Sequence, residues 1–78
     1  MEDLFSTSLA VNDHTISYRV FFDQEQYHFR AEESKGEQAF SEFSFRREHD
    51  EWHEQELLPA DLRKQAIQAL ERYLLRQH

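Results

Sequence analysis

Apolar and polar residues alternate along the first half of the chain. Apolar side chains fall on odd-numbered positions from Phe5 to Val11 and on even-numbered positions from Thr15 to Phe22. This is the period of a half-buried β-strand. The same alternation returns in residues 27–32 and from about 40 to 47. The pattern predicts four antiparallel strands, each with one apolar face.

Short turns are expected between these strands. Asn12 and Asp13 tolerate the positive φ angles of a type I′ turn, and a hairpin closed there places Leu9 opposite Ile16. A second short turn at residues 24–25 keeps the apolar face continuous, although Gln-Glu is unfavourable in such a turn and a longer loop is the alternative. Gly36 marks the turn before the fourth strand.

The segment 48–56 has no clear period. It holds a single apolar residue, Trp52, among five acids and two histidines. We predict a short fifth edge strand that turns at His49 and Asp50. The alternative is an irregular connection in which Trp52 alone docks on the core.

From Pro59 onward the spacing becomes helical. Proline suits the first helical position, and Asp61 near the start with Arg72 and Arg76 near the end are favourable to the helix dipole. The apolar stripe is Leu62, Ala66, Ile67, Leu70, Tyr73 and Leu74. Because an isolated helix of this length is marginal in water, the stripe is expected to dock on the sheet. The sequence therefore predicts one α+β domain over residues 1–78, a four- to five-stranded antiparallel β-meander with one C-terminal α-helix across one face.

Composition narrows the location and the classes of partner. The 78 residues include 16 acids and 9 bases, giving a net charge of -7, and there is no cysteine. The charge opposes binding to nucleic acid, and the lack of cysteine fits a reducing compartment. No apolar stretch approaches the roughly 20 residues that cross a bilayer, and the N-terminal Glu2 and Asp3 are unlike a signal peptide. We expect a cytoplasmic protein without nucleic acid or membrane partners.

The outward face of the sheet is the first candidate binding surface. The inferred registers place Arg19 opposite Arg30 and Phe21 opposite His28. The candidate partner- or anion-binding residues are Arg19, Phe21, His28, Arg30 and Arg46. Arginines beside an aromatic ring suit a phosphate or another anion. The competing interpretation is a solvated face on which Glu42 neutralises Arg30 and Glu32 neutralises Arg19.

Apolar residues left outside the core suggest a protein contact. Leu4, Phe21 and Phe40 are expected to point away from the helix, and Leu75 falls outside the helical stripe. If Leu4 and Phe21 are neighbours on the open face, these two residues form a small apolar patch suited to a protein partner or a self-dimer.

Metal binding is a further alternative. His49 and His53, with Glu54 and Glu56 nearby, contain ligand types for a divalent ion. However, Asp50 stands where a zinc-protease motif requires glutamate, and in a strand the two imidazoles lie too far apart without a turn. We therefore predict no metal ligands, and a solvated acidic edge is the preferred interpretation.

Catalytic motifs are missing from the sequence. A chain with one glycine and no cysteine has neither a glycine-rich phosphate loop nor a thiol nucleophile, and no serine lies in an elbow motif. We expect a small non-catalytic binding or assembly domain without a cofactor that uses the open face of the sheet. A purely structural homodimer subunit is the remaining alternative.

Overall fold

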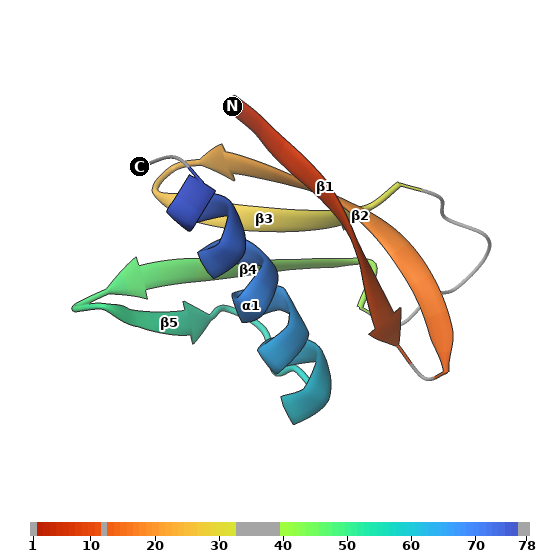
Figure 1. Cartoon of the computed structure of the whole chain (residues 1–78). Coiled ribbons are helices and arrows are strands. Elements are labelled where there is room, and N and C mark those ends of the chain that lie inside the picture. The colour runs from red at the N-terminus through yellow and green to blue at the C-terminus, as the bar shows by residue number, and fades with distance from the viewer. Residues whose placement is uncertain (1, 12, 33–39, 77–78) are drawn as a thin grey trace.

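The protein folds as a five-stranded antiparallel sheet crossed on one face by a single helix (Figure 1). The computed structural model describes residues 2–11, 13–32 and 40–76, and the statements below concern those residues. The strands follow one another in the sheet in chain order. This confirms the α+β meander and shows that residues 51–54 form the fifth strand. The elements are β1 (Glu2–Val11), β2 (His14–Asp23), β3 (Gln26–Ala31), β4 (Glu42–Glu48), β5 (Glu51–Glu54) and α1 (Ala60–Arg76).

Tight turns join β2 to β3 and β4 to β5. Gln24 and Glu25 have φ angles of 52° and 63°, and His49 and Asp50 have 51° and 65°. Two left-handed residues in succession are the signature of a type I′ turn, whose twist matches that of the flanking strands. The short turn at residues 24–25 is thus confirmed despite its unfavourable residues, as is the turn at residues 49–50. The other predicted turn residues, Asn12 and Gly36, lie outside the described residues.

An irregularity in β1 changes the expected register at its start. Asp3 pairs with Phe21, whereas Phe5 pairs with Val20, so the register shifts across Leu4. Leu4 packs against the core and Phe21 is only 6% exposed. The prediction of an exposed patch made by Leu4 and Phe21 is therefore wrong, because the bulge takes Leu4 out of the alternation that the sequence suggested.

The core lies between the sheet and α1. Its largest fully buried side chains are Tyr18, Phe29, Phe43, Phe45, Leu70 and Val20. Helix α1 buries Leu62, Ala66, Ala69 and Leu70, and begins at Ala60, one residue after the proline that was expected to open it. The aromatic strand faces and the helical stripe therefore meet as predicted. Within the described residues no helix is both long and apolar enough to cross a membrane.

Phe40 belongs to this core and not to the open face. It packs against the buried cluster, and its carbonyl accepts a hydrogen bond of 2.7 Å from the Tyr18 hydroxyl. Burial raises the pKa of the Tyr18 phenol above its ordinary value. The expectation that Phe40 points away from the helix is wrong, and β4 begins at Glu42, after Phe40 adopts a φ of 61°.

Candidate functional site

The predicted open-face residues lie in the expected registers, but their side chains bind one another. Arg19 pairs with Arg30 and Phe21 with His28 across β2 and β3. The His28 ring stacks on Phe21 with centroids 5.1 Å apart, and the Arg30 guanidinium carbon lies 5.2 Å from the Phe21 centroid. Phe21 is therefore covered by its neighbours and presents little apolar surface to a partner.

Each of the three candidate arginines on this face has a carboxylate partner. The ion pairs are Arg19–Asp3 at 3.9 Å, Arg30–Glu42 at 3.0 Å and Arg46–Glu48 at 3.3 Å. Glu42 pairs with Arg30 as expected, whereas Arg19 pairs with Asp3 and not with Glu32. Such exposed pairs add little to stability, but they match the positive charge locally. An anion binding here would have to compete with these carboxylates.

A small cavity of about 80 Å³ lies beside His28 on the same face. The carbonyl oxygen of Asp23 accepts from His28 Nε2 at 3.2 Å, so His28 Nδ1 accepts from the Ser44 hydroxyl at 2.8 Å when the imidazole is neutral. The Glu56 carboxylate accepts from the backbone N–H of Ser44 at 2.9 Å. Both nitrogens of the His28 ring are therefore hydrogen-bonded within the domain, and these bonds connect neighbouring strands of the sheet.

The sequence missed Ser44 and Glu56 as members of this cluster. Ser44 was accessible from the register, since it pairs directly with His28 across β3 and β4. The position of Glu56 could not be predicted from strand pairing, because Glu56 lies after the end of β5 in a segment without regular structure.

The two histidines of the acidic segment lie in different elements. His49 occupies the turn after β4, and His53 lies on β5, with Nε2 3.8 Å from a Glu51 oxygen. Among the described residues, no group of three or more His, Cys, Asp or Glu side chains is arranged to hold a metal ion. The metal alternative therefore gains no support from this geometry.

The outer edge of β1 differs from the open face because no described residue binds part of its backbone. In an antiparallel strand the backbone groups of alternate residues point away from the neighbouring strand, and at Ala10 both the N–H and the C=O do so. The Gln65 side chain of α1 binds both groups, at 2.9 and 3.0 Å. By the same alternation Ser8 and Ser6 point their backbone groups outward, and no hydrogen bond from the described residues reaches them there.

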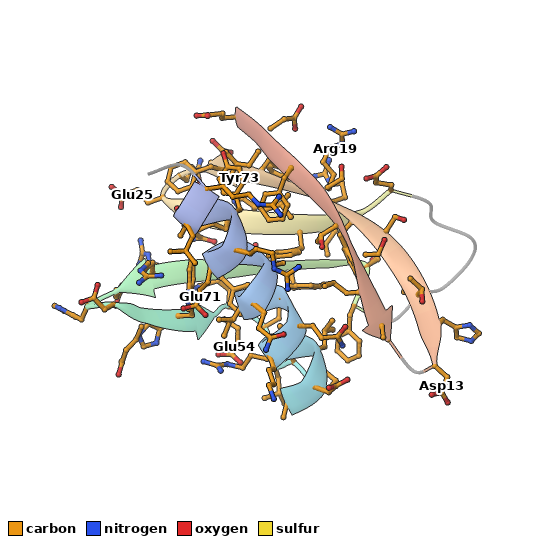
Figure 2. All side chains as sticks on the ribbon, in the orientation of Figure 1. Asp13, Arg19, Glu25, Glu54, Glu71 and Tyr73 are labelled. Atoms are coloured by element: carbon orange, nitrogen blue, oxygen red, sulfur yellow. The ribbon has the colours of Figure 1, made fainter. Side chains whose placement is uncertain are left out.

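A groove of about 160 Å³ runs beside this unpaired stretch, between β1 and the last turns of α1. Its aromatic wall is Phe5 stacked on Tyr73, with centroids 4.8 Å apart and an interplanar angle of 18°. Figure 2 shows Tyr73 between the end of α1 and β1. The groove is lined by residues 5–7 of β1 and by Ala69, Arg72, Tyr73 and Arg76 of α1.

At the opposite edge of the sheet, α1 contacts β5 through Arg63. Arg63 donates to the carbonyl of Trp52 at 3.0 Å and pairs with Glu54 at 2.7 Å. Partial burial raises the pKa of Glu54. The hydrogen bonds from its own backbone and from Arg63 together lower the pKa by more than burial raises it, so the pKa lies below its ordinary value. Edge β5 is thus short and acidic, and α1 binds one of its backbone carbonyls.

The β1 edge from Ser6 to Ser8 therefore combines outward-pointing backbone groups with an adjoining groove. Comparison with protein-family models, with curated proteins and with solved structures found no match, so the assignment of a function rests on this geometry alone.

Proposed function

We propose that this chain is a non-catalytic protein-interaction domain that binds an extended segment of a partner as a sixth strand on the outer edge of β1. The observation that carries the proposal is the pair of outward-pointing backbone groups at Ser6 and Ser8 beside the groove. An added strand would satisfy those groups, and a side chain of the segment would enter the groove. Main-chain hydrogen bonds supply affinity in this mode, while the groove supplies selectivity.

The edge is a better binding surface than the open face. On the open face Phe21 is covered by His28 and Arg30, and the candidate arginines are matched by carboxylates. A partner there would replace contacts that the domain already makes with itself. On the β1 edge a partner would add hydrogen bonds to backbone groups that none of the described residues reaches.

A different protein is favoured over a second copy of this chain. Two copies would each bring a net charge of -7, which opposes their approach. The Gln65 clamp at Ala10 also shortens the edge on which two copies of β1 could pair. The same charge, with the absence of cysteine, supports a cytoplasmic location and a protein rather than a nucleic-acid partner.

The test uses a variant that blocks the edge without disturbing the β1–β2 ladder. Ser6→Pro removes an outward N–H and places a ring on the edge, a position where proline is tolerated in strands. Ser6→Ala is the matched control, since it keeps the backbone donor. Peptides selected from a random displayed library against the wild type are measured by calorimetry against all three proteins.

We expect the selected peptides to bind the wild type and Ser6→Ala alike and to bind Ser6→Pro at least about tenfold more weakly. Amide exchange at Ser6 and Ser8 should slow in the complex. A circular dichroism melt confirms that Ser6→Pro remains folded. Selection of no peptide, equal binding to Ser6→Pro, or peptide-induced NMR shifts confined to Arg19, Phe21 and His28 would contradict the proposal.

A further inference from the structure

Two arginines of α1 differ from the other arginines of the chain. In the part of the chain that the structure describes, Arg72 and Arg76 have no carboxylate within ion-pair distance, and both line the groove beside β1. The remaining arginines all have such a partner; they are Arg19, Arg30, Arg46, Arg47 and Arg63. The unmatched guanidinium groups are thus gathered at the one surface where an added strand would lie.

None of the described residues that line the groove is acidic. The cavity beside His28 is lined in part by Glu42 and Glu56. Two further surface hollows are lined in part by Glu71 and by Glu25 with Glu48. In a chain with 16 acids, the groove instead combines its arginines with the hydroxyl-bearing residues Ser6, Thr7 and Tyr73. A site of this composition favours a negatively charged group.

The spacing of the two arginines favours a group with more than one negative charge. Positions four residues apart lie on the same face of a helix, so both guanidinium groups reach one side of α1. Each guanidinium presents a planar set of N–H donors. A phosphoryl group carries a charge of about -1.5 to -2 and three strong acceptor oxygens, whereas a carboxylate carries a single charge and two oxygens. Two unpaired arginines therefore match a phosphoryl group more fully.

The helix dipole does not account for this arrangement by itself. Cations in the last turn are stabilised by the negative end of the helix, which explains the place of Arg76. It does not explain why carboxylates are missing from the lining of the groove or why the second arginine, Arg72, faces the same hollow.

We propose that the groove is a subsite for a phosphorylated side chain carried by the strand that β1 receives. This inference rests on the proposed function, because it names the class of segment that the edge would select. Arg72 and Arg76 would bind the phosphoryl oxygens, while the backbone of Ser6 would pair with the segment that carries the phosphate. Phosphorylation of the partner would then control its association with this domain.

The experiment compares three versions of one peptide selected on the edge, with serine, glutamate or phosphoserine at the position nearest the groove. We expect phosphoserine to bind the wild type about tenfold or more tightly than serine, and more tightly than glutamate. In the variant Arg72→Gln/Arg76→Gln the three peptides should bind with nearly equal affinity. The variant Arg19→Gln/Lys64→Gln removes the same number of charges elsewhere and should retain the preference.

The outcomes separate the two proposals. Equal binding of all three peptides to the wild type, still abolished by Ser6→Pro, would overturn the phosphate subsite and leave strand addition in place. A preference for phosphoserine that survives Ser6→Pro, or inorganic phosphate binding as tightly as the phosphopeptide, would show an anion site unconnected with the edge. Loss of the preference in Arg19→Gln/Lys64→Gln would show that net charge alone is responsible, and would also overturn the inference.

Discussion

The two edges of the sheet are covered to different extents by the same helix. At β5, which has four residues, Arg63 binds the Trp52 carbonyl and the Glu54 carboxylate. At β1, which has ten residues, Gln65 binds both backbone groups of Ala10. Figure 1 shows why one helix serves both edges, since α1 lies with β1 on one side and β5 on the other.

The difference between the edges arises along the length of the helix. The residues that bind the two edges, Arg63 and Gln65, both lie in the first turns of α1, whereas the last turns border a groove beside β1. A long edge with open backbone groups invites pairing with other chains, and proteins commonly shorten, charge or cover such edges. Here β5 has four charged or aromatic residues and one carbonyl bound by Arg63, while in the described part of the chain the ten-residue β1 is bound by α1 side chains at Ala10 alone. The greater length of β1 beyond Ala10 is the reason for the proposal that β1 receives a partner strand.

The largest effect should come from removing the aromatic anchor of each edge. Trp52 is 7% exposed, and the centroids of its ring and of the Tyr27 ring are 5.5 Å apart. Phe5, by contrast, is only partly buried. We expect Trp52→Ala to cost about 3–5 kcal/mol, comparable to the whole stability of a small domain, and Phe5→Ala to cost less than about half of that. Urea unfolding at neutral pH measures both values. Equal losses would show that the two edges are anchored alike.

A milder substitution isolates the size of the Trp52 ring. The Nε1 donor of Trp52 is buried without a hydrogen-bond partner among the described residues. Trp52→Phe should therefore cost only the packing of the larger ring, about 1–2 kcal/mol, with no hydrogen bond lost. A loss as large as that of Trp52→Ala would contradict this interpretation.

The clamp on β1 should give an intermediate effect. Gln65→Ala removes two hydrogen bonds to Ala10 and should cost about 1–2 kcal/mol. Because these bonds close one end of the edge, the amide of Ala10 should exchange with solvent faster in the variant. Gln68→Ala, at an exposed position of the same helix, is the control and should leave both quantities nearly unchanged. Unchanged exchange at Ala10 in Gln65→Ala would show that the clamp does not protect the edge.

The periodicity of the sequence was sufficient to predict the fold, because the strand alternation, the turn lengths and the helical stripe each restrict how the others can be arranged. Alternation fixes which residues of β2 and β3 share a face, and a two-residue turn then fixes the pairing of Arg19 with Arg30. The helical stripe needed an apolar partner, and the aromatic faces of the strands were the large surface that offered one. These are local rules of spacing, and the structure follows them throughout in β2, β3 and β4.

The same periodicity was not sufficient to predict the candidate site. The bulge at Leu4 leaves no mark in the alternation of β1, so Leu4 was assigned to the wrong face. Gln65 and Ala10 are 55 positions apart, and their contact depends on the angle at which α1 crosses the sheet. Arg72 and Arg76 were interpreted only through the helix dipole, because a groove shared between a helix and a strand edge is a tertiary feature.

The smallest effect should appear at the β5 edge as the pH falls. The pKa of Glu54 is lower in the folded protein than its ordinary value of 4.5, so the carboxylate contributes stability above that pH and loses it as the pH falls through the folded-state pKa. We expect Glu54→Gln to cost about 1 kcal/mol or less at pH 7, and this difference from the wild type to shrink in urea unfolding as the pH falls below 4.5. Glu71→Gln serves as the charge-matched control on α1. A difference between Glu54→Gln and the wild type that stays constant down to pH 3 would show that Arg63 holds the β5 edge through the Trp52 carbonyl alone.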